Sequence, residues 1–148
     1  MPRTRAAILA ASAAAALLLS GCGFASPIRT LQTYSASDGV RVELADGVRV
    51  ENLMVLTEAE GEAGRLLGAV VNPTEDDARV RIAVSGSTTE VRVPAGDVVN
   101  LVDEADVVAA VAAPPGATIE ASIEFRGTTT ARIPVLDGTI PPYDEYLP

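Results

Sequence analysis

The 148-residue sequence contains no histidine, no lysine and no tryptophan, and every basic residue is an arginine. It therefore lacks the usual general base, the imidazole metal ligand and the amine nucleophile. Serine side chains have no histidine or lysine to activate them, which leaves only paired carboxylates for acid–base chemistry. We expect a protein that is not an enzyme and that carries no cofactor.

Cysteine and aromatic residues are almost as scarce. Cys22 is the only cysteine, which excludes an internal disulfide and a thiolate metal cluster, and the few aromatic residues (two Phe, three Tyr) give little surface for a sugar. The formal net charge is −9, from 11 basic and 20 acidic residues. A surface of this sign repels nucleic acid and anionic lipid headgroups, so we expect no nucleic-acid partner.

The stretch Leu19-Ser20-Gly21-Cys22 closes an apolar run over residues 6–19 that follows a short basic start. The run is too short to span a bilayer, which needs roughly 20 apolar residues, but it has the length of a signal-peptide core. Small side chains directly before a cysteine resemble the lipobox of bacterial lipoprotein signal peptides. An ordinary secretory signal with an incidental cysteine, or a short uncleaved anchor, are the alternatives.

The lipobox resemblance implies that residues 1–21 are a signal peptide and that the thiol of Cys22 takes a diacylglyceryl group. The lipid would attach the protein to the outer face of the cell membrane, against the electrostatic repulsion of its acidic surface. Residues 22–37 have little periodicity and are predicted to be the lipidated N-terminus and a flexible tether.

Alternating apolar and polar residues dominate the sequence from position 40 onward. Short alternating runs separated by turn residues at intervals of roughly ten residues predict an antiparallel β-sandwich of about eight strands over residues 38–138. Asp46-Gly47 predicts a tight hairpin turn, because glycine accepts a positive φ. Residues 53–56 are apolar at every position, which predicts a strand in the middle of a sheet. The expected strands cover residues 40–44, 48–56, 65–71, 79–84, 90–93, 98–101, 107–111, 119–125 and 131–135.

Two segments are harder to assign. Residues 97–113 fit a helix about as well as strands; their β-branched content favours two short strands, 98–101 and 107–111, around a turn at 103–106. Residues 139–148 form an acidic tail rich in proline and tyrosine that we expect to be extended. Its Pro-Pro-Tyr sequence, at 141–143, would also suit a partner's aromatic groove.

The order of strands and turns from Val91-Arg92-Val93-Pro94-Ala95-Gly96 onward resembles a known family. A strand ending in Pro-Ala-Gly, two short apolar strands, Pro-Gly, a strand ending in Phe and a closing Ile-Pro-Val are similar to PCuAC-type periplasmic copper chaperones. They are closer still to actinobacterial LpqE-type lipoproteins. The resemblance covers roughly residues 48–135 and implies an immunoglobulin-like or cupredoxin-like sandwich.

The resemblance does not carry a copper site over to this sequence. The family binds copper through His and Met, whereas this chain has no His, and Met54 is its only Met after the signal peptide. A lone thioether does not make a specific site for soft Cu(I). The acidic groups at 75–77, 103–106 and 144–145 lack the spacing of a calcium loop and are interpreted as solvated turns. We therefore assign no metal ligands.

Three functions remain as hypotheses. The first is a non-enzymatic binding or interaction module of the cell envelope with a protein partner there, which predicts an exposed apolar patch on one sheet or at the tail. The second is a metal-handling protein that descends from a copper chaperone and has lost its ligands. The third is a small-ligand carrier, which predicts an apolar pocket between the sheets. Oligomeric state is not indicated by the sequence.

Overall fold

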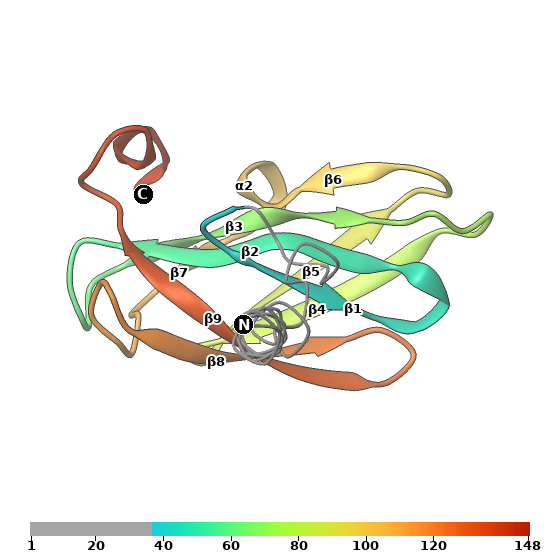
Figure 1. The fold of residues 1–148 in the computed structure, drawn as a ribbon, viewed down its shortest axis with the longest axis horizontal. Helices are drawn as coiled ribbons and strands as arrows, with labels where there is room; N and C mark the ends of the chain where they lie inside the picture. Colours follow the sequence, from blue (N-terminus) through green and yellow to red (C-terminus); the bar gives the residue numbers. More distant parts are fainter. Residues whose placement is uncertain (1–36) are drawn as a thin grey trace, which may run out of the picture. The chain divides into compact units, whose positions relative to one another are not determined.

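The structure is a computed structural model that describes residues 37–148, all within one compact unit (Figure 1). The predicted lipobox, signal peptide and most of the predicted tether lie outside these residues. Within the described part of the chain, no helix is long and apolar enough to cross a membrane. The unit is built almost entirely of strands, which confirms the all-β prediction.

Nine strands, one helical turn and two 3₁₀ turns make up the described chain. The elements in order are β1 (Val40–Glu43), η2 (Ala45–Gly47), β2 (Arg49–Thr57), β3 (Gly64–Val71), β4 (Ala78–Val84), β5 (Ser87–Val93), β6 (Val98–Asn100), α2 (Leu101–Glu104), β7 (Val107–Val108), β8 (Thr118–Glu124), β9 (Thr128–Asp137) and η3 (Tyr143–Tyr146).

The strands form two layers that share β9 (Figure 1). One layer has the order β5-β4-β8-β9, and the other has the order β9-β2-β3-β6, with β1 beside β2 and β7 beside β3. Residues 128–134 of β9 pair with β8, whereas 135–137 pair with β2 in parallel. The sandwich is therefore nearly closed into a barrel, and this one parallel pair differs from the purely antiparallel expectation. It arises because β9 crosses from one layer to the other.

An aliphatic core fills the space between the layers, as the composition predicts. The strand expected to alternate most cleanly does so: Ala121 and Ile123 of β8 are fully buried, and Ser122 and Glu124 face outward. Their neighbours Ile82 and Ile133 in β4 and β9 are also buried. Burying a side chain of this kind contributes roughly 1.5–3 kcal/mol, so these layers supply most of the fold's stability.

The predicted turn at Asp46-Gly47 is confirmed. Both residues have a positive φ, 54° and 77°, and the turn joins β1 to β2. The amide of Leu44 donates to the carbonyl of Val48 at 2.8 Å, which closes the hairpin. Asp and Gly are among the residues that tolerate this conformation with the least strain.

A β-bulge at Asn52 changes which side of β2 faces the core. Val50 faces the core before the bulge, and Leu53 and Val55 face it afterwards, so the alternation shifts by one position. Asn52 has a φ of 53°, and its side-chain oxygen accepts a hydrogen bond from the amide of Gly39 at 2.7 Å. Met54 consequently points to the outer face of the sheet. As predicted from residues 53–56, β2 lies between other strands on both sides.

Residues 97–113 form shorter strands than predicted, with a helical turn between them. Strand β6 ends at Asn100, and Leu101 is fully buried at the start of α2. The predicted second strand is reduced to β7, Val107–Val108. Both strands pair with β3. Strand β6 pairs with residues 69–71 of β3, and β7 pairs with residues 64–65, at the other end of the strand. The helical turn bridges the gap between them.

The prediction of an extended C-terminal tail was wrong. Residues 143–146 form η3, and Tyr143 and Leu147 pack against Met54, Leu56 and Leu67 on the outer face of β2 and β3. Residues 53–56 of β2 are apolar on both faces, which explains why the tail folds back. Their outward side chains would otherwise face water. Folding the tail back over them removes that exposure.

Candidate functional site: a groove beside the C-terminal tail

None of the residues predicted from the lipobox can be placed in the structure. Leu19, Ser20, Gly21 and Cys22 lie outside the described residues, so the lipidation site stays a prediction from sequence. The candidate site in the described part of the chain is a groove on the outer face of β2 and β3.

This groove, called here the tail groove, has a volume of about 470 Å³. It runs between η3 on one side and α2 on the other, with β2 and β3 as its floor. Its lining residues are Glu51, Asn52, Met54, Leu67, Gly68, Ala69, Asn100, Val102, Pro142, Tyr143 and Tyr146.

The floor of the tail groove is apolar and well packed. Met54 and Leu67 are 2% and 7% exposed, and they are held in place by the tail residues Tyr143 and Leu147. Gly68 has a φ of 138°, and a β-carbon there would lie 2.8 Å from the carbonyl oxygen of Glu51. Glycine is therefore required where the two strands approach at the bulge.

Polar groups surround this floor. Glu51 accepts hydrogen bonds from Arg41 at 2.7 Å and from Arg49 at 2.8 Å. Burial acts to raise the pKa of the Glu51 carboxyl, but the two arginines outweigh it and lower the pKa below its ordinary value. Glu51 thus stays ionised and paired at neutral pH. Asn100, at the start of α2, and Tyr146, in η3, add an amide and a phenol on the two sides of the groove.

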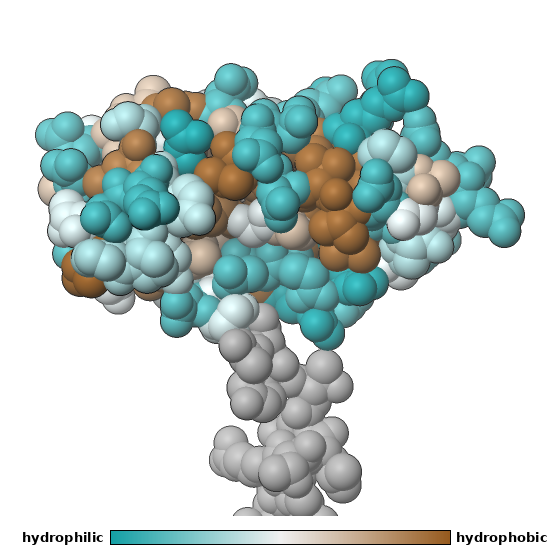
Figure 2. Space-filling model, turned by 90° about the horizontal axis from the view of Figure 1, so that it is seen from above, coloured by the Kyte–Doolittle hydropathy of each residue, from teal (hydrophilic) through white to brown (hydrophobic). Residues whose placement is uncertain are grey.

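Apolar side chains are also exposed around the groove. Four large ones are well exposed in the described part of the chain, on β6, on β7 and in the tail: Val98 at 51%, Val107 at 42%, Ile140 at 55% and Tyr146 at 37%. Figure 2 shows this side of the molecule, where apolar surface gathers between polar patches. Of these four residues Tyr146 lines the groove, and Val98 and Val107 lie at opposite ends of the β3 edge.

One hydrogen bond holds the tail to the start of the domain. The hydroxyl of Tyr143 donates to the carboxylate of Asp38, which raises the pKa of Tyr143 to about 12, and partial burial acts in the same direction. Gly138 lies directly against Leu147, because a β-carbon at position 138 would overlap a methyl carbon of that leucine. The tail therefore approaches the sheet closely at both points.

We expect Tyr143 to titrate late. Its folded-state pKa lies above that of an unfolded tyrosine, near 10, so its contribution to tail docking is complete below about pH 10 and is lost as the pH rises through about 12. Absorbance at 295 nm should show a late ionisation step that Tyr143→Phe removes. Tyr146→Phe is the matched control and should leave the late step in place. A single early transition in the wild type would contradict the Tyr143–Asp38 contact.

The tail groove offers apolar contacts and hydrogen-bonding groups. Within residues 37–148, no group of three or more His, Cys, Asp and Glu side chains lies close enough together to hold a metal ion. Met54 contributes a thioether to the groove, without a second soft donor from the described residues. The Pro-Pro-Tyr sequence lies against the protein's own sheet, where Pro142 and Tyr143 form one wall of the groove.

Comparison with known proteins adds no assignment. No family model matches the chain, and the searches of curated proteins and of solved structures also find no match. The resemblance to LpqE-type lipoproteins therefore stays a prediction from sequence.

Sequence reasoning did not find the groove, because its walls come from four separate segments. These are residues 51–54, 67–69, 100–102 and 142–146. One signal was present: the apolar residues on both faces of 53–56 indicated that something covers the outer face of the strand. The sequence did not indicate that the cover would be the tail.

Proposed function

We propose that this protein is a bacterial lipoprotein, attached through lipid on Cys22 to the outer face of the cell membrane. Its β-sandwich is a non-enzymatic binding module of the cell envelope, and its binding surface is the tail groove with the exposed apolar residues around it. The observation that carries the binding role is this apolar groove on the outside of a fully packed sandwich. The lipobox sequence supports the anchoring, as does the resemblance to LpqE-type lipoproteins.

The apolar surface agrees with what an interaction role requires. Val98, Val107 and Ile140 expose aliphatic area that a partner bound at the groove would cover in part. The groove itself is a preformed concave site, so a partner could enter it without rearranging the domain. The tail wall of the groove is held by the packing of Tyr143 and Leu147 and by the Tyr143–Asp38 hydrogen bond, and a preorganised wall lowers the entropic cost of association.

Photocrosslinking in the native envelope tests this proposal. A photoreactive amino acid at Val102, on the wall of the groove, should give a discrete adduct, whereas one at Thr88, on the far layer, should not. Ala69→Arg places a long charged side chain on the groove floor and should abolish the adduct. Ala83→Arg, at a half-exposed alanine on the outer face of β4, is the matched control and should preserve it. Equal crosslinking from both positions would contradict the proposed surface.

A small-ligand carrier is the second candidate, favoured by the size of the groove. Its volume of about 470 Å³ lies within the range of roughly 300–1,000 Å³ typical of small-molecule sites. The groove lies on the outside of the sandwich, whereas the sequence-based carrier hypothesis placed the pocket between the sheets. Native mass spectrometry of protein purified from its own envelope distinguishes the two candidates, because a carrier should retain a small molecule that Ala69→Arg displaces.

A further inference from the structure

The layer opposite the tail groove carries most of the arginine of this acidic protein. Of the eight arginines at or after position 41, five lie on β4, β5, β9 and the β8–β9 turn. These are Arg79, Arg81, Arg92, Arg126 and Arg132. Five acidic side chains, of Asp46, Asp77, Glu90, Glu120 and Glu124, lie beside them, so this face is close to neutral although the whole chain carries a net charge of −9.

Two of these arginines are direct cross-strand neighbours. Arg79 of β4 pairs in register with Arg92 of β5, which places two positive side chains on adjacent positions of the same face. Like charges in this arrangement destabilise a sheet unless an anion neutralises them. Arg92 is neutralised by Asp77, with an N–O distance of 2.6 Å, and this contact lowers the pKa of the Asp77 carboxyl below its ordinary value.

Arg79 has no such partner among the described residues. It makes no ion pair or hydrogen bond through its side chain there, whereas its neighbours are engaged. Arg81 lies between Glu90 at 3.0 Å and Glu124 at 3.7 Å, and Arg126 pairs with Asp46. Arg79 and Arg132 are thus the two arginines of this layer without an ion pair among the described residues, and of the two only Arg79 lines a cavity.

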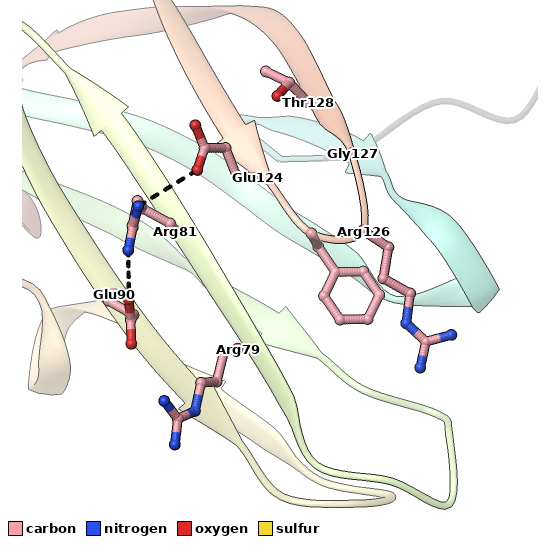
Figure 3. Close-up of a pocket in the computed structure, with 8 residues that line it drawn as sticks. Arg79, Arg81, Glu90, Glu124, Arg126, Gly127 and Thr128 are labelled. Atoms are coloured by element: carbon pink, nitrogen blue, oxygen red, sulfur yellow. Dashed lines mark hydrogen bonds and ion pairs between the residues drawn. The ribbon is translucent and has the colours of Figure 1, made fainter.

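The free guanidinium of Arg79 lines a cavity of about 490 Å³ (Figure 3). Phe125, Arg126 and Thr128 line the same cavity. The guanidinium carbon of Arg126 lies 5.4 Å from the centre of the Phe125 ring, so the ring is already stacked against one cation. The cavity therefore combines a free cation with one aromatic ring, which also packs partly against the core, and the carboxylates of Glu90 and Glu124 line it as well.

We propose that this cavity binds an anion with a planar apolar body, through a carboxylate or phosphate on Arg79 and packing of the body against Phe125. A guanidinium binds such anions with two parallel hydrogen bonds. Glu90 and Glu124 are held by Arg81, which limits their repulsion of the ligand. This site is independent of the tail groove and lies on the other layer.

Titration of the full-length protein in mild detergent with phenylphosphate, followed by amide NMR at constant ionic strength, tests the proposal. We expect saturable shifts at residues 79–81 and 124–128 at millimolar concentrations. Inorganic phosphate should shift the same amides with weaker affinity, and phenol should shift them least. Arg79→Gln should weaken phenylphosphate binding about fivefold or more, and Phe125→Leu about threefold.

Arg132→Gln is the matched control, because Arg132 lies on the same layer but does not line the cavity. It should leave the affinity unchanged. Equal weakening by Arg79→Gln and Arg132→Gln would overturn the proposal, since it would indicate a general charge effect. Shifts that do not saturate, or that fall outside the cavity, would overturn it as well. Tail-groove variants such as Ala69→Arg should have no effect on this titration.

Discussion

Asn72→Ala is expected to lower the free energy of unfolding by about 3 kcal/mol. Asn72 follows β3, is fully buried and serves as a polar hub for the loops at that end of the sandwich. Its amide nitrogen donates to the carbonyl oxygens of Asp76 at 2.8 Å, Val93 at 3.1 Å and Pro94 at 3.0 Å. Its side-chain oxygen accepts from the amide and the hydroxyl of Thr74, at 3.1 and 2.7 Å.

The alanine variant removes all five hydrogen bonds, of which the one to the carbonyl of Val93 is fully buried. Unsatisfied buried polar groups cost about 1–3 kcal/mol each, although water entering the space left by the amide recovers part of this. Asn72→Asp is a sharper variant, because it keeps the shape but directs a carboxylate oxygen at the carbonyls of Val93 and Pro94. We expect it to be at least as destabilising as alanine at neutral pH.

Urea unfolding followed by far-UV circular dichroism measures both effects. Asn100→Ala is the control, since Asn100 is exposed and its side chain does not cap α2 by a hydrogen bond. That change should alter stability by no more than about 0.5 kcal/mol. If Asn72→Ala and Asn100→Ala unfold at the same urea concentration, the hub does not hold these loops together.

Cys22→Ala is expected to move nearly all of the protein from the membrane to the soluble fraction. Each buried methylene of a lipid chain contributes about 0.8 kcal/mol to membrane binding, and an acidic domain has no electrostatic attraction to replace it. Ser20→Ala is the matched control, because alanine also satisfies the lipobox pattern, and that variant should remain on the membrane.

Fractionation is read together with intact-mass spectrometry of the wild-type protein. We expect a mass that corresponds to a chain beginning at Cys22 with a diacylglyceryl group. A wild-type chain that retains residues 1–21, or that lacks the lipid mass, would rule out the lipobox interpretation. A Cys22→Ala protein that fractionates with the membrane after cleavage of residues 1–21 would show that another element provides the attachment.

Much of the strand pattern could be predicted because it depends on neighbours in the sequence. Alternation over residues 119–125 requires only that one face of a strand be buried, and β8 follows it. Asp46-Gly47 determines its turn through its own φ preferences. Neighbours in the sequence did not predict residues 98–111 correctly. The helical turn α2 forms there because β6 and β7 pair with the two ends of β3 and the chain must connect them.

By itself, the sequence determined the all-β class, the aliphatic core, the absence of histidine chemistry and the lipobox that predicts the anchor. These follow from composition and from patterns a few residues long. Only the tertiary structure decided that β9 joins the two layers. It also decided that the bulge at Asn52 changes which side chains of β2 face the core. The tail closes over Met54 and Leu56 and forms the groove, which again only the tertiary structure shows. These features depend on contacts between residues far apart in the chain, such as Tyr143 with Asp38, and burial of apolar surface selects among them once the strands are assembled.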